Sequence, residues 1–128
     1  MKQLILDTNI CIELLNGNEH TIKKLSKYSV ICVPIIVCGE LLFGAKNSKR
    51  SKSNEKKFKT FIDSCVVLNT NSLVAKEYAT IRKYLKDNGT PIPENDIWIA
   101  AICKVNDIPL ATKDKHFKNI LGISLAKF

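Results

Sequence analysis

The alternation of short apolar runs with longer segments of helical periodicity is the feature that most constrains the fold of this chain. Apolar and β-branched runs predict five short strands, over residues 3–6, 30–33, 66–68, 109–112 and 124–126. The segments between them predict helices over residues 9–15, 19–28, 34–45, 71–88 and 96–105, and a loop that leads into a helix ending near Cys65. Strands that alternate with helices favour an α/β fold, with a largely parallel sheet covered by helices on both faces.

The length and the cysteines limit the class of protein. The chain has 128 residues and contains no internal repeat or linker, so we expect a single domain over residues 1–128. Its longest apolar stretch, residues 30–45, is interrupted by Pro34, Gly39 and Glu40, and we expect no membrane association. Five cysteines without a CxxC pair lie in or beside apolar runs, which is typical of buried thiols in a reducing compartment. A cytoplasmic protein is therefore expected.

The charge of the chain points to a polyanionic partner. Lys and Arg number 20 against 12 Asp and Glu, a formal net charge of +8. A small domain this basic favours nucleic acid, although a lysine-rich surface can also serve solubility alone. Residues 46–59 carry seven Lys or Arg and one acid, Glu55. The candidate RNA contacts are Lys49, Arg50, Lys52, Lys56 and Lys57 in this run, and Lys113, Lys115 and Lys118 further along the chain.

Three aspartates stand where a parallel sheet would gather ligands. Asp7 follows the first predicted strand, and Asp114 lies just past the strand over residues 109–112. Ligands of open parallel sheets collect outside the carboxyl ends of the strands, near the point where the strand order reverses. Asp96 falls in the first turn of a predicted helix, where the helix dipole favours an anion. Each of the three, taken singly, is also a good helix cap.

Glu40 makes the functional interpretation stronger. It is the only charged residue between Pro34 and Ala45, in a segment that is apolar nearly all round and is therefore predicted to be buried. A buried, unpaired carboxylate costs several kcal/mol, so either a lysine or a bound cation must offset it. We expect Glu40 to face the same crevice as Asp7, with a salt bridge to a lysine as the alternative.

Carboxylates that converge on one crevice need a cation between them. Oxygen ligands suit Mg²⁺ or Mn²⁺, and a carboxylate-held divalent cation on a basic protein serves metal-assisted hydrolysis of a phosphodiester bond. Thr8, Asn9 and Thr112 are candidates for supporting residues that orient the acids, although turn and capping roles fit them equally well. His116 follows the last acid in a predicted turn, and a structural role is expected for it.

Four short motifs carry a family resemblance. They occur in the order and spacing of a PIN domain, over most of the chain from Met1 to about Gly122, and they read Leu6-Asp7-Thr8-Asn9, Gly39-Glu40-Leu41-Leu42-Phe43-Gly44, Asn95-Asp96-Ile97-Trp98-Ile99-Ala100-Ala101 and Thr112-Lys113-Asp114-Lys115-His116-Phe117. The loop Gly89-Thr90-Pro91-Ile92-Pro93 strengthens the match to VapC-type toxins of bacterial toxin–antitoxin pairs.

The resemblance implies both a fold and an activity. It implies a three-layer sandwich with a mostly parallel central sheet, and a Mg²⁺- or Mn²⁺-dependent endoribonuclease. The catalytic and metal-binding carboxylates would be Asp7, Glu40, Asp96 and Asp114. It further implies a homodimer and a cognate antitoxin. Some members of this group cut tRNA, but no residue of this sequence identifies that substrate.

Two other classes of function stay open at the level of sequence. One is a nucleic-acid-binding α/β module without catalysis, in which the basic run over residues 46–59 is the contact surface. The other is a receiver- or phosphatase-like domain that uses Asp7 as phosphoryl acceptor. Receivers need a further acid after a central strand, which residues 66–71 lack, and the phosphatase pattern needs an Asp where this chain has Asn9.

Overall fold

A five-stranded parallel sheet forms the centre of the molecule. The computed structural model describes residues 2–128. The strands are β1 (Gln3–Leu6), β2 (Val30–Pro34), β3 (Val66–Leu68), β4 (Leu110–Ala111) and β5 (Leu125–Ala126), in the order β3-β2-β1-β4-β5. Every pair of neighbouring strands is parallel. The five predicted strands are thus confirmed, with the last two shorter than expected.

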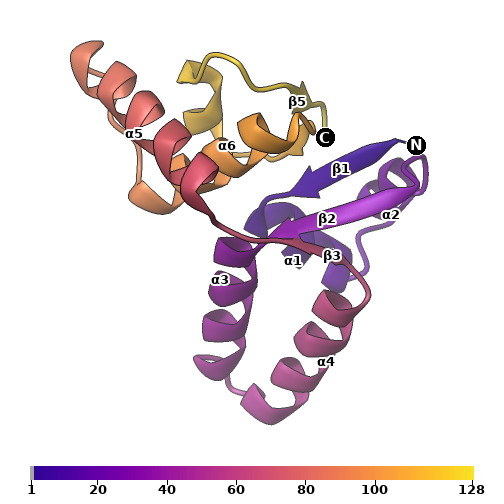
Figure 1. Cartoon of the computed structure of the whole chain (residues 1–128). Coiled ribbons are helices and arrows are strands. Elements are labelled where there is room, and N and C mark those ends of the chain that lie inside the picture. The colour runs from indigo at the N-terminus through magenta and orange to yellow at the C-terminus, as the bar shows by residue number, and fades with distance from the viewer. Residues whose placement is uncertain (1) are drawn as a thin grey trace.

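Helices cover both faces of the sheet, as the sequence predicted (Figure 1). The helices α1 (Thr8–Leu15), α2 (Glu19–Leu25), α3 (Ile35–Lys46) and α4 (Ser51–Asp63) connect β1 to β2 and β2 to β3. The helices α5 (Ser72–Asp87) and α6 (Glu94–Asn106) lead from β3 to β4, and the 3₁₀-helix η1 (Lys115–Asn119) leads from β4 to β5. From β1 the chain proceeds to β2 and β3 on one side, and from β3 it returns to β4 on the other side of β1. Because connections between parallel strands are right-handed, this reversal places α5 and α6 on the face of the sheet opposite α1–α4. Three layers result.

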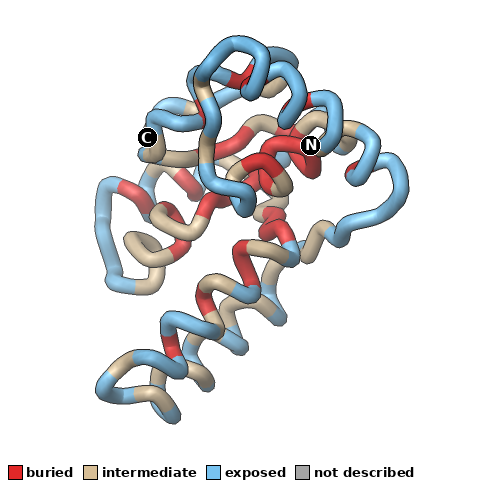
Figure 2. Tube along the Cα trace, turned by 90° about the vertical axis from the view of Figure 1, so that its left-hand side faces the viewer, coloured by how far each residue is buried: buried red, intermediate tan, exposed pale blue. Residues whose placement is uncertain are grey.

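Buried segments gather in the middle of the molecule (Figure 2), and β1 and α6 contribute many of the buried residues. Leu4, Ile5 and Leu6 of β1 are completely buried, as are Ile99 and Ile102 of α6. The central strand is apolar on both faces because helices cover both, so it reads as a continuous apolar run. Burial holds the carboxyl end of β1, and with it Asp7, in a fixed position relative to α6.

The helix that contains Glu40 differs from its prediction. Only one face of α3 is buried, while Ile35 is 41% exposed and Phe43 is 68% exposed. The expectation of a helix buried all round was wrong, because α3 pairs with α4 in a hairpin that projects away from the strands (Figures 1 and 2). Glu40 is accordingly half-buried, and it forms no ion pair with any of the residues 2–128.

Several helix ends also differ from the prediction. Asn95 was expected to cap the helix of Asp96, but α6 begins at Glu94, because the extended Pro93 occupies the cap position and its carbonyl accepts the Asp96 and Ile97 N–H groups. Helix α2 ends at Leu25, three residues early. Asn71 caps α5 as predicted, and Gly89, with a φ of +67°, follows its end.

The burial of the cysteines agrees with the expectation from the sequence. The five thiols are free, and all but the half-buried Cys65 are buried. Within residues 2–128, no helix combines the length and apolar composition needed to cross a membrane.

Candidate active site

Asp7 stands at the centre of a polar network at the carboxyl edge of the sheet. It follows β1 directly and caps α1, where its Oδ1 accepts the Thr8 backbone N–H at 2.8 Å. Its Oδ2 accepts the Thr112 hydroxyl at 2.7 Å and the Asn9 amide at 3.3 Å. The side chain is buried, and this burial raises the pKa of Asp7, while the Thr112 and Thr8 hydrogen bonds oppose the rise. The carboxylates of Glu40 and Asp114 also raise the pKa of Asp7.

Thr112 joins the loop after β4 to Asp7. Its hydroxyl donates to Asp7 and accepts the Asp114 backbone N–H at 3.0 Å. Asn9 closes the same loop from α1, because its Oδ1 accepts the Lys113 backbone N–H at 3.1 Å. Asp114 in turn caps η1, with its Oδ1 accepting the His116 backbone N–H at 2.9 Å. The loop after β4 is thus fixed to the start of α1 by side-chain hydrogen bonds.

Glu40 enters the network from α3. The Thr8 hydroxyl donates to its Oε1 at 2.8 Å. Thr8 thus brings Glu40 and Asp7 together, because its hydroxyl donates to one carboxylate and its backbone N–H to the other. Glu40 is half-buried, whereas the sequence predicted that it would be buried. A threonine hydroxyl, and not a lysine, is the partner of this carboxylate.

Asp96 brings the fourth carboxylate from the opposite layer. It lies in the first turn of α6, and its side chain is 13% exposed. Burial raises the pKa of Asp96 to about 6, with the carboxylates of Asp114 and Asp7 adding to the rise and the His116 hydrogen bond opposing it. The four predicted acids therefore lie at one edge of the sheet, on α1, α3, α6 and the loop after β4.

His116 lies between two of these acids, where the sequence predicted only a structural role. Its Nδ1 is 3.2 Å from Asp96 Oδ2 and 2.9 Å from Asp114 Oδ1. The hydrogen bond to Asp96 is the main cause of the raised pKa of His116. The signal in the sequence was the spacing Asp114-Lys115-His116, because a capping Asp and the residue two places later lie on the same side of a turn.

The donor set fits a divalent cation. Ligand atoms of Asp96, Asp114 and His116 lie within 4.8 Å of one another. Burial is the main cause of the raised pKa values of Asp7 and Asp96, and neighbouring carboxylates add to both. A bound cation would offset the negative charge of these acids. Carboxylate oxygens with a single imidazole suit Mg²⁺ or Mn²⁺ better than a soft metal.

The candidate RNA contacts divide into two groups. Lys49 and Arg50 occupy the turn between α3 and α4, and Lys52, Lys56 and Lys57 lie on α4 (Figure 1). Lys113 and Lys115 flank Asp114 instead, beside the carboxylates. The Lys113 ammonium forms an ion pair of 2.7 Å with Glu13 of α1.

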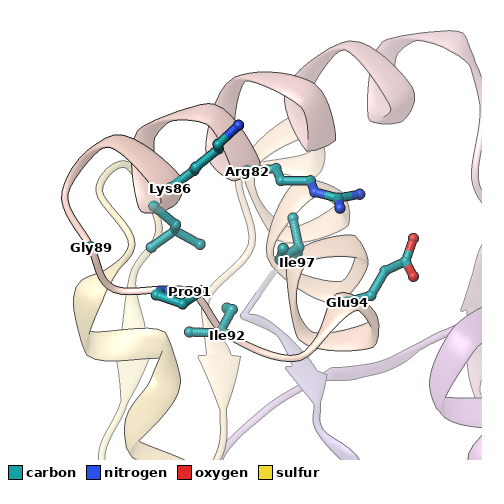
Figure 3. Close-up of a pocket in the computed structure, with 8 residues that line it drawn as sticks. Arg82, Lys86, Gly89, Pro91, Ile92, Glu94 and Ile97 are labelled. Atoms are coloured by element: carbon teal, nitrogen blue, oxygen red, sulfur yellow. The ribbon is translucent and has the colours of Figure 1, made fainter.

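An apolar pocket of about 440 Å³ lies apart from the carboxylates, between the end of α5 and the start of α6 (Figure 3). Ile92 and Ile97 form its apolar wall, and Arg82, Lys86 and Glu94 stand at its edge. None of the four acids lines it, so it is separate from the candidate active site.

Comparisons with known proteins agree with this geometry. Residues 4–122 match the family described as PIN domain. The tRNA(fMet)-specific endonuclease VapC of Salmonella typhimurium is 30% identical over 128 residues, covering 98% of this chain and 97% of that protein. Ribonuclease VapC2 of Rickettsia felis is 29% identical over 126 residues, covering 94% of each chain.

A solved structure extends the similarity to the fold. The crystal structure of DNA-bound VapBC from Salmonella typhimurium contains a chain that superposes with a TM-score of 0.91 at 29% identity, over 98% of both chains. With the family match spanning nearly the whole sequence, the chain belongs to the PIN domain family, among its VapC proteins.

Proposed function

We propose that this protein is a divalent-cation-dependent endoribonuclease and the toxin of a toxin–antitoxin pair. The observation that carries the proposal is the hydrogen-bonded network that gathers Asp7, Glu40, Asp96 and Asp114 at the carboxyl edge of the sheet. The similar proteins named ribonuclease and tRNA(fMet)-specific endonuclease support the reaction class. Cleavage of a phosphodiester bond in RNA, with tRNA as the first substrate to test, is the activity we infer.

The four acids are assigned as the catalytic and metal-binding residues. The Mg²⁺ or Mn²⁺ ion would be held by Asp7, Asp96 and Asp114, together with Glu40. When bound, the cation supplies Lewis-acid polarisation of the phosphate and lowers the pKa of water. Thr112 and Asn9 fix the Asp7 carboxylate, and Thr8 fixes that of Glu40, so the ligand atoms are held in place before a cation or substrate binds.

His116 has a role in the same proposal. Its Nδ1 contacts both Asp96 and Asp114, so a proton on this nitrogen is shared between two carboxylates. The adjacent carboxylates raise the pKa of His116, so its ring is protonated up to a higher pH than a free imidazole. Occupancy of the site by a cation would displace that proton.

A cognate antitoxin and a second copy of the chain are the proposed protein partners. The structure from Salmonella typhimurium is a VapBC complex bound to DNA, and the relatives of this chain are VapC proteins. Ile35 and Phe43 on α3 and Leu73 on α5 are exposed apolar side chains that a protein partner would cover. We place the protein in the cytoplasm, where such a toxin would meet RNA.

The test is incubation of the purified protein with total cellular RNA, with and without Mg²⁺. Discrete fragments that form only with Mg²⁺ or Mn²⁺, and not with the Asp7→Asn variant, would support the proposal. A fraction of purified tRNA, assayed alongside, shows whether tRNA is the preferred substrate. Intact RNA under all conditions would leave a non-catalytic nucleic-acid-binding module as the better description.

A further inference from the structure

A basic groove adjoins the carboxylate site. Its volume is about 520 Å³, and it runs from the loop after β4 across η1 to β5 and the last residues of the chain. Thr112 and Asp114, which belong to the carboxylate network, also line the groove. The groove is therefore continuous with the candidate active site, unlike the apolar pocket between α5 and α6.

Positive charge predominates in this groove. Its lining includes the four lysines Lys113, Lys115, Lys118 and Lys127, against one acid, Asp114. From residue 115 to the end of the sequence no acidic side chain occurs. The Lys113 ammonium is paired with Glu13, whereas Lys115, Lys118 and Lys127 form no ion pair within residues 2–128. Three ammonium groups are thus left without a counter-charge beside a cluster of carboxylates.

The groove also has an apolar wall, and Lys24, which does not line the groove, contacts two of its residues. Lys24 of α2 donates to the Lys127 carbonyl at 3.0 Å, and its ammonium lies 5.4 Å from the centre of the Phe128 ring. Leu125, Ala126 and Phe128 provide apolar contact surface along the groove. Lysines beside apolar and aromatic groups are the composition that binds single-stranded nucleic acid, because the ammonium groups contact phosphates while sugars and bases pack against the apolar wall.

We propose that this groove binds the sugar–phosphate backbone of the RNA strand on one side of the bond that is cut, a proposal that rests on the ribonuclease function above. Phosphates held by Lys115, Lys118 and Lys127 would direct the strand past Asp114 into the carboxylate site. The sequence also predicted a contact surface on Lys49–Lys57. Residues 49–57 lie on the α3–α4 hairpin and line no part of this groove, so substitutions on the two surfaces can be tested separately.

The experiment measures RNA affinity against salt concentration for two matched variants. The groove variant carries Lys115→Gln, Lys118→Gln and Lys127→Gln, and the control carries Lys52→Gln, Lys56→Gln and Lys57→Gln on α4, with the same loss of charge. The probe is a short fluorescent single-stranded RNA of random sequence, bound in Ca²⁺, with its integrity checked on a gel. Each lost phosphate contact lowers the slope of log affinity against log salt by about 0.7, so the groove variant should lose about 2 from the slope.

The expected result is a flatter slope for the groove variant and an unchanged slope for the α4 control. A third variant with Arg at the three groove positions should keep the parental slope, which shows that charge and not shape is responsible. An unchanged slope in the groove variant, or equal flattening in both Gln variants, would overturn the proposal.

Cleavage assays with Mg²⁺ separate this proposal from the ribonuclease function. The groove variant should raise KM and leave kcat near the parental value, because the carboxylates are untouched. If the parent cuts RNA but the groove variant binds with the parental slope, the groove proposal fails and the activity stands. If the parent cuts no RNA, the activity fails, and the salt slopes still decide whether the groove binds RNA.

Discussion

At the scale of single residues, the same aspartates cap helices and form part of the candidate site. Asp7 caps α1 through Oδ1 while Oδ2 serves the polar network, and Asp114 caps η1 beside the same network. The sequence presented capping and function as alternatives for both residues. A carboxylate has two oxygens and four lone pairs, so one side chain can do both. The helix start then fixes the direction of the carboxylate.

Asp7→Asn should abolish RNA cleavage and leave the fold intact. An asparagine caps a helix as well as an aspartate, and its carbonyl oxygen can still accept the Thr8 N–H. The negative charge that would hold the cation is lost, and we expect activity to fall more than about 100-fold, since even residues that only orient metal ligands contribute about 10- to 100-fold. Cleavage rates in Mg²⁺, with circular dichroism as the control for folding, test this. Parental cleavage by the variant would show that Asp7 is not a ligand.

Glu40→Gln should lower activity strongly without destabilising the cation-free protein. The amide oxygen can still accept the Thr8 hydroxyl, and one repelling charge beside Asp7 is removed. We expect the free energy of unfolding to stay level or rise by less than about 1 kcal/mol. Chemical denaturation in EDTA measures it, with Glu55→Gln on α4 as a control for the loss of a glutamate charge. A large loss of stability with activity retained would assign Glu40 a structural role.

At the scale of elements, the ends of helices decide where the acids lie. Helix α6 begins one residue before Asn95 because Pro93 provides the extended backbone of the cap, and Asp96 is thereby placed in the first turn. At the end of α5, Gly89 has a left-handed backbone that lets the chain turn into the loop leading to α6. The position of Asp96 therefore depends on residues that never touch the site.

Gly89→Ala should destabilise the protein by about 1 kcal/mol, because an L-residue pays a conformational penalty at this φ of +67°. No atom lies within 4 Å of the added Cβ, so backbone strain is the only cost. Gly39→Ala is the matched control, since Gly39 lies inside α3, also with open space around it, and alanine there should stabilise by up to about 1 kcal/mol. Urea denaturation of both variants measures the difference. Equal changes in the free energy of unfolding of the two variants would show that the left-handed backbone at Gly89 is not the cause of the penalty.

At the scale of the whole molecule, the acids of a basic protein are concentrated at one edge of its sheet. Four of the twelve acidic residues meet there, in a chain of net charge +8. We expect these acids to repel one another without a cation, so the free energy of unfolding should depend on pH and on divalent ions. The surrounding positive surface attracts the phosphates that such a cation would help to cleave.

The cation-free protein should lose stability as the pH rises from about 4 to about 7 relative to Asp96→Asn. The folded pKa of Asp96 is about 6 against an ordinary value of 3.8, so the folded state holds a proton that the unfolded state releases in this range. The raised pKa of His116 acts in the same direction, because its proton stabilises the fold at low pH and is lost as the pH rises. Urea denaturation of both proteins in EDTA across this range gives the difference.

Added Mg²⁺ should restore stability near pH 7, because it binds the ionised carboxylates of the folded state. It should have less effect near pH 4, where a proton occupies the Asp96 carboxyl group. The Asp96→Asn variant should respond less to Mg²⁺ at either pH. A parent protein whose melting temperature is indifferent to Mg²⁺ at pH 7 would contradict the cation site.

The sequence by itself determined the parallel α/β architecture and the identity of the acids. Both are properties of local pattern, since apolar runs, helix periodicity and the aspartates after the strands are visible within a few residues. The proximity of Asp7 and Asp114 could be predicted because both follow parallel strands, whose carboxyl ends lie at one edge of the sheet. The full set of four acids came from the resemblance to PIN domains.

Only the tertiary structure decided what surrounds the acids. Thr112 and Asp7 are 105 residues apart in the chain, and His116 and Asp96 are 20 apart, yet each pair is in hydrogen-bond contact. The exposure of α3 depends on its pairing with α4. The basic groove forms because the loop after β4 and η1 lie beside β5 and the last residues of the chain, which α2 contacts through Lys24. Such contacts join residues distant in sequence, and their geometry is set by how layers pack, which no local pattern encodes.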